Sequence, residues 1–547
     1  MPLHFPGNKM LAGCLSISQQ NFNSQFSSLA THPPEPAMEE LLRFSISILL
    51  IPLAFLLLNF FIIQARKTRQ VTVSPPSLPI IGHLHLLRPP LHQSLHQLTS
   101  RYGPVIHLRL GSTPVILVAS ADATKELIKT YDQDLSDRPL TAAARHFAYD
   151  SSGFAFAPYG PYWRFMKKLC MSELLSSRTV DCLAHIRRRE LRALLRTLAA
   201  KSAAAESVDL SKELIRMTTS IIAGMTAGTA SAGDSEAARK AVKGVAELIG
   251  SLYLADFIGF FRYFDLQGFK KRIEQVRDDF DELMERIISE KEAMRKSCLG
   301  GDGDKDLLDI LLDAAENEAM EIRLTRKNIK SFILDIFTAG SDSSAATTEW
   351  ALAELINHPE MLSKAREEID NAVGRNRLIE ESDIQNLKYL QAVIKETLRL
   401  HPAAPMAMRK ATKDIKQGEY EIFNGNTVII NVYSVNRDPK YWEKPSEFRP
   451  NRFMEDGDQE LSYKGMHFQY LPFGSGRRMC PGATLSVQVI TMTLAALIQC
   501  FEWGEDGGRV KKLDMSEGPG MVILRTKPLI CVPKTRLHPL PPEVLNL

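Results

Sequence analysis

Cysteine is scarce in this sequence and is never paired. The 547 residues contain seven widely separated cysteines with no Cys-x-x-Cys motif, namely Cys14, Cys170, Cys182, Cys298, Cys480, Cys500 and Cys531. Disulfide-bonded secreted domains carry closely spaced cysteines, so the sequence excludes a small scaffold of that kind. We expect reduced thiols that face the cytosol, and one of them, Cys480, stands in a recognisable motif.

A charge excess of either sign is also missing. The 67 basic and 64 acidic residues leave a net charge of +3 without a long basic block, so a nucleic-acid partner is not expected. No internal repeat occurs, and no Gly-x-Gly-x-x-Gly fingerprint joins a strand to a helix, so the chain has no dinucleotide site of its own. The length suggests several domains, but the composition does not change mid-chain, which favours one large domain.

One long apolar run is present near the N-terminus. Residues 44–63 form a stretch of about 20 residues without a charge, which at 1.5 Å per residue matches a bilayer core of about 30 Å. A cleaved signal peptide is the competing interpretation, but the run is too long for its apolar core and no small-residue cleavage site follows. Basic residues at 66, 67 and 69 follow the run, and acidic residues at 39 and 40 precede it. The positive-inside rule therefore places the C-terminal bulk in the cytosol.

This anchor divides the chain into four parts. Residues 1–37 have few charges, no helical period and a proline-rich end, which indicates a disordered extension or an over-long gene model. A plastid transit segment is the rival, although the stretch has no arginine. Residues 38–69 are the membrane anchor with its basic flank, residues 70–82 are a proline-rich, extended hinge, and residues 83–547 are the large domain.

The strongest motif lies near the C-terminus, where residues 473–482 read FGSGRRMCPG. Five positions would fall into this register by chance in about one in ten thousand chains of this length: Phe473, Gly476, Arg478, Cys480 and Gly482. Gly476 permits a tight backbone path under a flat ligand. Cys480 opens a helix whose N-terminal dipole favours a metal-binding thiolate, and Arg478 can bring a positive charge to carboxylates at the edge of that ligand.

This loop resembles the haem-thiolate loop of the cytochrome P450 superfamily, in which the cysteine ligates iron and favours O–O cleavage. The resemblance runs from about residue 75 to the C-terminus. It implies a mainly α fold with small β-sheets, in which a single large catalytic domain follows an N-terminal transmembrane helix. It also implies haem b with Cys480 as the axial ligand, O2, and electrons from NADPH through NADPH–cytochrome P450 reductase, with cytochrome b5 as a further donor. The protein would lie in the endoplasmic reticulum membrane, its catalytic domain in the cytosol and a small apolar substrate in its pocket.

A long helix over residues 323–357 is expected to cross this domain, with Thr325 as its N-cap and His358-Pro359 as its end. Its middle is small and polar, where a buried helix is usually apolar. Gly340 and the neighbouring hydroxyls can open the hydrogen-bond ladder and leave room for dioxygen and water. Asp342 can relay protons and Ser343 can donate a hydrogen bond, as the acid–alcohol pair of the resembled family does. The family usually has threonine at the alcohol position, so Ser343 puts tight coupling of electrons to product in doubt.

Further segments resemble the parts of the family that hold the haem. Glu396 and Arg399 share one face of a helix, and Arg452 in a later loop would join them in a buried network. A solvated ion pair is the ordinary interpretation of such spacing. The family more often has glutamate where Asn451 stands. Shorter elements are also predicted, namely a β-hairpin over residues 105–110 and 114–119 and a helix over residues 121–131.

Three more side chains are assigned to the haem propionates by the resemblance. Trp163 and Lys167 lie one helical turn apart, and Arg409 follows the Glu396–Arg399 helix by ten residues. An interfacial Trp beside a solvated Lys is the ordinary alternative for the first two. A basic face around Lys167, Lys168 and Arg477 is expected to meet the reductase.

The amino-acid sequences of several segments resemble most those of plant enzymes that oxidise flavonoids: flavone synthase II, 2-hydroxyisoflavanone synthase and the pterocarpan hydroxylases. Members that migrate the aryl ring tend to carry lysine before the arginine corresponding to Arg409 and serine four residues before the helix acid. This chain has Met408 and Thr338 there, which favours oxidation of a flavanone to a flavone over isoflavonoid chemistry. An apolar pocket is expected from Phe154, Phe156, Thr338, Ala339, Met408, Met521 and Val522, although plain core is the common role of such side chains.

Two other classes of protein share a ligated cysteine. A haem-thiolate isomerase or dehydratase rearranges peroxides without a reductase, and the proton relay suggested by Asp342 and Ser343 argues against it. A haem sensor or structural membrane protein would need neither that pair nor the network around Glu396.

Overall fold

The computed structural model describes residues 73–149, 151–228, 235–251, 253–263, 265, 267–297, 305–417, 420–454, 461–503 and 512–545, and six residues between 44 and 54. The chain divides into two units, Met1–Gln70 and Val71–Leu547. In the first unit, the six described residues are helical with exposed side chains: Phe44, Ile46, Ile48, Leu50, Ile51 and Ala54. Residues 1–37, the rest of the expected anchor and its basic flank lie outside the described residues.

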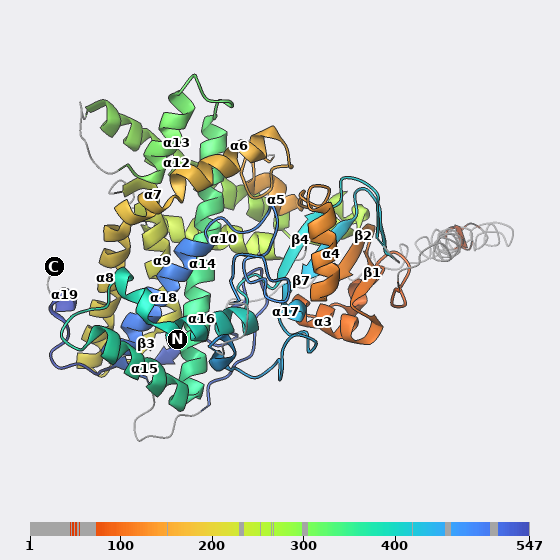
Figure 1. Ribbon diagram of the computed structural model, residues 1–547. Helices are drawn as coiled ribbons and strands as arrows, with labels where there is room; N and C mark the ends of the chain where they lie inside the picture. Colours follow the sequence, from red (N-terminus) through yellow and green to blue (C-terminus); the bar gives the residue numbers. More distant parts are fainter. Residues whose placement is uncertain are drawn as a thin grey trace, which may run out of the picture. The chain divides into compact units, whose positions relative to one another are not determined.

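Helices dominate the second unit (Figure 1). The first half contains α3 (Leu91–Tyr102), α4 (Ala121–Tyr131), α5 (Ala142–Phe147), α6 (Pro161–Leu169), α7 (Ser177–Cys182), α8 (Ala184–Ala203), α9 (Leu210–Ala227), α10 (Ser235–Gly250), α11 (Leu254–Phe257), α12 (Phe269–Ser297) and α13 (Leu307–Glu316). The second half contains α14 (Arg326–Asn357), α15 (Pro359–Val373), α16 (Lys388–Leu400), α17 (Val432–Val435), α18 (Ala483–Cys500) and α19 (Pro542–Leu545). The mainly helical fold expected from the sequence is confirmed.

Strands form one sheet of four and three pairs. They are β1 (Val105–Leu110), β2 (Thr113–Val118), β3 (Val208–Asp209), β4 (Met406–Lys410), β5 (Ile415–Gln417), β6 (Tyr420–Ile422), β7 (Thr427–Asn431), β8 (Phe501–Glu502), β9 (Ile530–Cys531) and β10 (Lys534–Thr535). The four-stranded sheet has the order β1-β2-β7-β4, in which only β2 and β7 run parallel. The predicted hairpin and the helix after it are confirmed, because β1, β2 and α4 occupy those positions.

Helix α14 is the central element of the helical core. It packs against α9, α16 and α18 and runs through the middle of the ribbon in Figure 1. Its N-terminus is a capping box, in which the Thr325 side chain accepts from the amide of Asn328 and the Asn328 side chain accepts from the amide of Thr325. The helix ends at Asn357, and Pro359 opens α15. The predicted cap and end are therefore confirmed.

Helix α18 is also a core element. Among the described residues, it is the one helix long and apolar enough to cross a membrane, but most of it is buried in the second unit. Its apolar character therefore reflects core packing.

The proline-rich hinge is less extended than the sequence indicated. Residues 73–77 have no regular structure, but Leu78 and Gly82 then pair through two backbone hydrogen bonds and close a turn. Gly82 has a φ of 60°, and an added Cβ would lie 2.1 Å from the carbonyl oxygen of Arg109 on β1. Glycine is required at this close approach, so the end of the segment is held against the sheet instead of forming a spacer.

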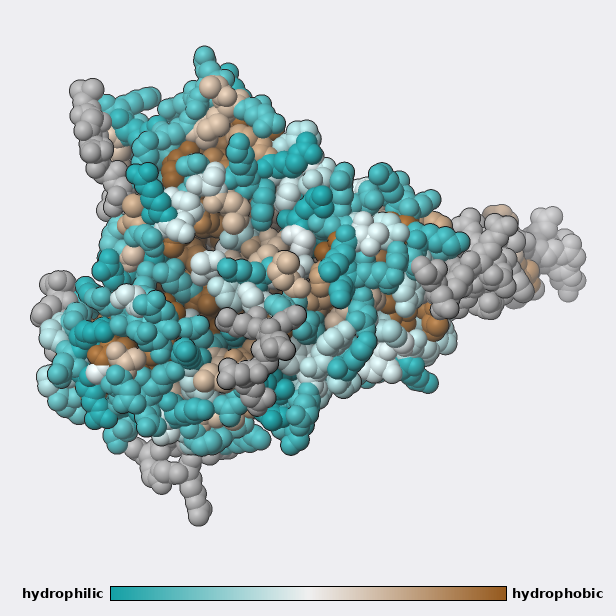
Figure 2. Space-filling view, in the orientation of Figure 1, coloured by the Kyte–Doolittle hydropathy of each residue, from teal (hydrophilic) through white to brown (hydrophobic). Residues whose placement is uncertain are grey.

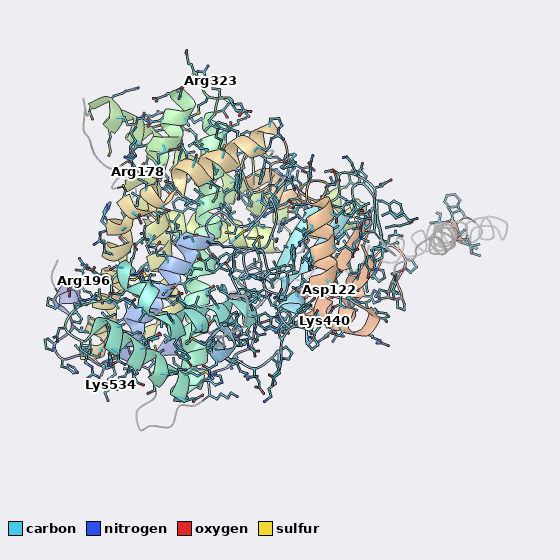
Figure 3. All side chains as sticks on the ribbon, viewed as in Figure 1. Asp122, Arg178, Arg196, Arg323, Lys440 and Lys534 are labelled. Carbon is cyan, nitrogen blue, oxygen red and sulfur yellow. The ribbon has the colours of Figure 1, made fainter. Side chains whose placement is uncertain are left out.

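On the face of the molecule that Figure 2 shows, hydrophilic residues prevail and apolar residues form scattered patches. Ion pairs between segments distant in the sequence join parts of this surface. Lys440, which follows α17, lies beside Asp122 on α4 in Figure 3, with Nζ 2.5 Å from Oδ2. An exposed pair of this kind contributes little to stability.

Candidate active site

The loop around Cys480 is held in a tight path by its own backbone. The amide of Cys480 donates to the carbonyl of Phe473 at 3.0 Å. Gly476 has a φ of 70°, and an added Cβ would lie 2.4 Å from Oδ1 of Asp132. Because a side chain at Gly476 would be both strained and blocked, the loop requires glycine there.

The Cys480 sulfur lies at the entrance to α18. Gly482 is the N-cap of that helix, and its amide donates a hydrogen bond to the cysteine. Burial raises the pKa of the Cys480 thiol, while the Gly482 amide and the charges of Lys167 and Arg138 act to lower it. The expectation that the helix start favours thiolate is therefore only partly met, because burial outweighs it. A metal ion that displaces the proton would complete the change to thiolate.

The middle of α14 is the accessible part of an otherwise buried helix. Residues 329–334 and 344–356 are buried, whereas Ala339 is exposed and the residues after it are mostly half-buried. An added Cβ on Gly340 would lie 2.7 Å from Ile222 of α9. A cavity of about 50 Å³ separates α9, this turn of α14 and the start of α18; its lining includes Gly340, Ser344, Gly482, Leu485 and Ser486. The accessible turn and the cysteine loop therefore border one interior space.

Asp342 and Ser343 both belong to this accessible turn. The Ser343 hydroxyl donates to the carbonyl of Ala339 at 2.6 Å. This side-chain bond competes for a carbonyl that also accepts in the backbone hydrogen-bond pattern of the helix. Burial raises the pKa of Asp342, and the charge of Lys243 on α10 partly offsets that rise. The two side chains therefore supply a hydroxyl donor and a proton-exchanging carboxyl at one point of the helix.

Arg478 is tied to the segment before α6. Its Nε donates to the carbonyl of Ser136 at 2.5 Å, and its Nη1 lies 3.3 Å from the carbonyls of Phe154 and Ala155. The guanidinium carbon is 4.7 Å from the ring centroid of Trp163 on α6, within cation–π range. Arg478 and Trp163 are thus neighbours.

Three donors near Arg478 are buried without a hydrogen-bond partner among the described residues: Nε of Arg138, Nε of Arg409 and Nε1 of Trp163. Burial, with the charges of Arg138 and Arg478, lowers the pKa of Arg409 to about 9. Burial and Arg138 likewise lower the pKa of Arg478 to about 10. Buried donors and mutually repelling cations of this kind indicate a site for an anionic ligand.

The sheet explains why these arginines meet. Asp137 forms a bridge with Lys410 at the edge of β4, which places Arg138 beside Arg409 on that strand. Loop 473–482 brings Arg478 from the C-terminal side.

A family model described as "Cytochrome P450" matches residues 73–532.

The chain belongs to the cytochrome P450 family.

Plant relatives cover nearly the whole of this cytochrome P450. "Cytochrome P450 93G1" of Oryza sativa subsp. japonica is 50% identical over 88% of this chain and 93% of its own length. The "3,9-dihydroxypterocarpan 6A-monooxygenase" of Glycine max is 45% identical over 90% and 99%, and the "2-hydroxyisoflavanone synthase" of Glycyrrhiza uralensis is 40% identical over 85% and 92%. A solved zebra fish cytochrome P450 with progesterone has a TM-score of 0.69 at 24% identity and covers 82% of this chain and all of its own. That structure supports the fold.

Haem is the cofactor of this family, and the side chains of this cytochrome P450 fit it. A haem has two carboxylates at one edge, which suit the buried donors of Trp163, Arg138, Arg409 and Arg478. Its iron accepts one thiolate, which Cys480 at the entrance to α18 can supply. The donor set therefore matches both ends of the group.

Arg138 is a functional residue that the sequence analysis missed. It stands in the segment Asp137-Arg138-Pro139, and no local pattern separates it from other surface-type arginines. Asp335 of α14 was missed as well. Its Oδ2 accepts from the amides of Phe154 and Ala155 at 2.7 and 2.9 Å, and burial raises its pKa to about 6. An acidic residue in an apolar stretch of a helix was the available signal.

Arg138→Leu is expected to speed haem loss about tenfold, because one charged hydrogen bond to a propionate contributes about 1.5–3 kcal/mol. The rate can be measured by transfer of haem to apomyoglobin. The haem-free variant should not unfold at a lower temperature, since the change removes a buried Nε–H that has no hydrogen-bond partner among the described residues. Arg145→Leu on the exposed side of α5 is the matched control. An unchanged rate of haem loss would remove Arg138 from the propionate site.

The structure brings Glu396, Arg399 and Arg452 together in one network, in which Glu396 and Arg399 are fully buried and Arg452 is 10% exposed. Nε and Nη2 of Arg399 lie 2.7 and 2.8 Å from the two Glu396 oxygens, and Nε of Arg452 lies 3.0 Å from Oε1. The backbone amide of Arg449 adds a further bond to Oε1 at 2.8 Å. Asn451, where the family more often has glutamate, accepts from Lys364 at 3.2 Å.

The side chains expected in the substrate pocket come from separate segments, namely the stretch before α6, the middle of α14, strand β4 and residues 521–522. Phe154 stacks on Trp163 with 5.5 Å between ring centroids, and Phe156 faces Arg138 at 6.0 Å. The Thr338 hydroxyl is buried and has no partner within the described part of the chain. Large apolar side chains are accessible as well, since Met408 and Met521 are 39% and 37% exposed, and Val522 is half-buried.

The structure changes which residues form the basic face that is expected to bind the reductase. Lys167 is half-buried, with Nζ 3.3 Å from the carbonyl of Met479, so it points toward the cysteine loop. Lys168 is exposed. Arg477 is 40% exposed but pairs with Asp132 at 2.8 Å. The exposed side chain of Arg164 on α6 adds to this face.

Proposed function

We propose that this cytochrome P450 oxidises a flavanone to a flavone, with O2 and with electrons from NADPH delivered by a separate diflavin reductase. The observation that carries the proposal is the buried hydroxyl of Thr338 on α14. It has no hydrogen-bond partner among the described residues and can bind a carbonyl or phenol oxygen of the substrate. The name of one relative refers to a pterocarpan substrate and that of another to an isoflavanone product. Met408 and Thr338 stand where aryl-migrating members tend to have lysine and serine, which favours the flavone product.

The roles of the chain's own residues follow from their positions. When bound, the haem would supply oxygen activation and hydrogen abstraction. Cys480 would hold its iron, and Trp163, Arg138, Arg409 and Arg478 would hold its carboxylates. Lys167 keeps its proposed place near the same group, on the side of Met479. Phe473, Gly476 and Gly482 shape the loop.

Proton delivery is assigned to Asp342 and Ser343. The raised pKa of the Asp342 carboxyl brings proton exchange closer to neutral pH. The Ser343 hydroxyl can leave the Ala339 carbonyl and donate to another acceptor instead. A reductase-independent isomerase would have no use for this pair.

Ser343→Ala is expected to lower the product formed per NADPH by about tenfold, because one hydroxyl donor is removed from the proposed site of oxygen activation. NADPH consumption should continue and hydrogen peroxide should rise, which a peroxide assay measures. Ser341→Ala is the matched control, because the buried Ser341 hydroxyl donates to the Phe337 carbonyl in the same way, at 2.8 Å. Equal coupling in both variants would remove Ser343 from proton delivery.

Isoflavonoid or pterocarpan hydroxylation is the second candidate, supported by the 45% identity to a pterocarpan monooxygenase. Product analysis with naringenin and liquiritigenin separates the two candidates. We expect flavones that form only with NADPH and reductase. Hydroxylated isoflavanones as the main product would overturn the flavone assignment, and product formation without NADPH would point to an isomerase.

The surroundings of the enzyme are also part of the proposal. The apolar run at 44–63 and its basic flank support an anchor in the endoplasmic reticulum membrane. Arg164, Lys168 and Arg477 lie near the cysteine loop and can receive an acidic surface of the reductase. Cytochrome b5 could use the same face.

A further inference from the structure

We propose that His401 and Glu517 are positioning residues that hold the hairpin bearing Met521 and Val522 in the substrate pocket. This hairpin, residues 516–526, is closed by hydrogen bonds from the amide of Gly518 to the carbonyl of Leu524 at 2.8 Å and from that of Thr526 to Ser516 at 2.9 Å. The inference rests on the haem-thiolate pocket and not on the flavonoid assignment.

Glu517 fastens the first strand of the hairpin to α3. Its Oε2 accepts from Nε2 of His92 and from Nε2 of Gln93, each at 2.6 Å. The carboxylate is 5% exposed. Burial alone would raise the pKa of Glu517, but His401, His92 and Gln93 outweigh it and hold that pKa below its usual range. The charge is therefore kept inside the protein by directed contacts.

His401 fastens the second strand through Trp350. Its Nε2 lies 2.8 Å from Oε1 of Glu354, and its Nδ1 lies 3.7 Å from Oε1 of Glu517. The imidazole stacks on Trp350, with 4.0 Å between centroids and 4° between planes. The Trp350 indole then donates to the carbonyl of Ile523 at 2.9 Å.

The hairpin is thereby linked to the helix that carries Asp342 and Ser343, because Trp350 and Glu354 also belong to α14. The amide of Ile523 donates to the carbonyl of Ala403 at 3.0 Å, which fixes both backbone groups of the residue after Val522. The hairpin tip also reaches α10, since an added Cβ on Gly250 would lie 3.1 Å from the amide of Met521. A shift of the hairpin therefore moves Met521 and Val522 toward or away from the space beside α14.

Polar contacts suit this task better than apolar packing would. Replacing a buried ion pair by well-packed apolar groups often leaves stability unchanged or raises it, so stability alone does not account for two imidazoles and two carboxylates here. Hydrogen bonds are directional and define one position, whereas apolar burial is not directional. A small displacement of a pocket side chain has large effects on a bound ligand.

Spectral titration of the ferric haem protein with two azoles tests the proposal without reference to the natural substrate. Imidazole needs only the iron, whereas clotrimazole, an imidazole with three aryl rings, also needs the pocket. For Glu517→Ala we expect clotrimazole to bind about tenfold more weakly. Imidazole should bind as it does to the unaltered enzyme, because its contacts lie at the iron. Glu517→Gln keeps an acceptor for His92 and Gln93 and should restore clotrimazole binding.

His401→Phe keeps the stacking on Trp350 but loses the bond to Glu354, so an intermediate weakening of clotrimazole is expected. Glu360→Gln, an exposed carboxylate on α15, is the matched control. All titrations use protein whose reduced carbon monoxide complex shows intact thiolate ligation. If Glu517→Ala does not bind haem, the proposal is tested by the difference in clotrimazole affinity between Glu517→Gln and His401→Phe. Equal effects on both azoles, or no effect on either, would overturn the positioning role. Failure to oxidise flavanones would leave this result unchanged and would sink the flavone assignment alone.

Discussion

Cys480→Ala is expected to abolish the red-shifted Soret band of the reduced carbon monoxide complex and all NADPH-dependent turnover. The cysteine is the one described thiol that sits at a helix entrance with cations nearby, and alanine cannot replace a thiolate on iron. The change should be nearly neutral for the fold, since Cys480 is half-buried and its backbone bond to Phe473 is retained, and only the bond from the Gly482 amide to the sulfur is lost. Difference spectra of microsomes and circular dichroism of the purified variant measure the two effects.

Cys182→Ala is the matched control, because Cys182 is an exposed cysteine at the end of α7 and should leave the spectrum unchanged. A red-shifted band that persists in Cys480→Ala would mean that another residue ligates the iron. The buried Cys170, close enough to Lys167 for their charges to interact, would then be the next residue to test.

Glu396→Gln is expected to lower the free energy of unfolding by about 3–5 kcal/mol, because it leaves Arg399 and Arg452 as buried cations without a counter-charge. Both Glu396 and Arg399 have fully buried side chains. Arg399 also holds the carbonyls of Asn436, Pro445 and Glu447, so the loop 436–452 should loosen with it. Thermal unfolding followed by the haem absorbance and by circular dichroism would record the loss.

Glu443→Gln is a control within the same loop. Glu443 pairs with Arg449 at 3.5 Å but is 76% exposed, so its loss should change stability by less than about 1 kcal/mol. Similar unfolding temperatures for Glu396→Gln and the unaltered protein would show that the network is not a support of the fold.

The sequence was most informative where chemistry is carried by neighbours along the chain. Cys480 and Gly476 share one loop, Asp342 and Ser343 are adjacent, and the cap of α14 at Thr325 depends on a residue three positions later. Local geometry decides such features, so residue type and spacing were enough to predict them.

The same reasoning failed where distant segments meet. Arg138 has no local pattern, and it becomes part of the site because Asp137 pairs with the edge of β4 next to Arg409. The pKa of Cys480 is raised because burial exceeds the effect of the helix entrance, and burial is set by packing around the loop. The turn at Gly82 likewise depends on the nearby backbone of β1.

The sequence by itself therefore determined the family and predicted the iron ligand, the acid–alcohol pair and an apolar anchor, since each depends on a short run of residues. Only the tertiary structure decided which arginines cluster beside Arg478 and how far α14 is accessible. It also decided how His92, His401, Glu354 and Glu517 come together beside the hairpin. The physical reason is the separation along the chain between the interacting residues. Residues close in sequence fix loops and caps, but desolvation, charge clustering and buried hydrogen bonds arise from side chains that only the fold brings together.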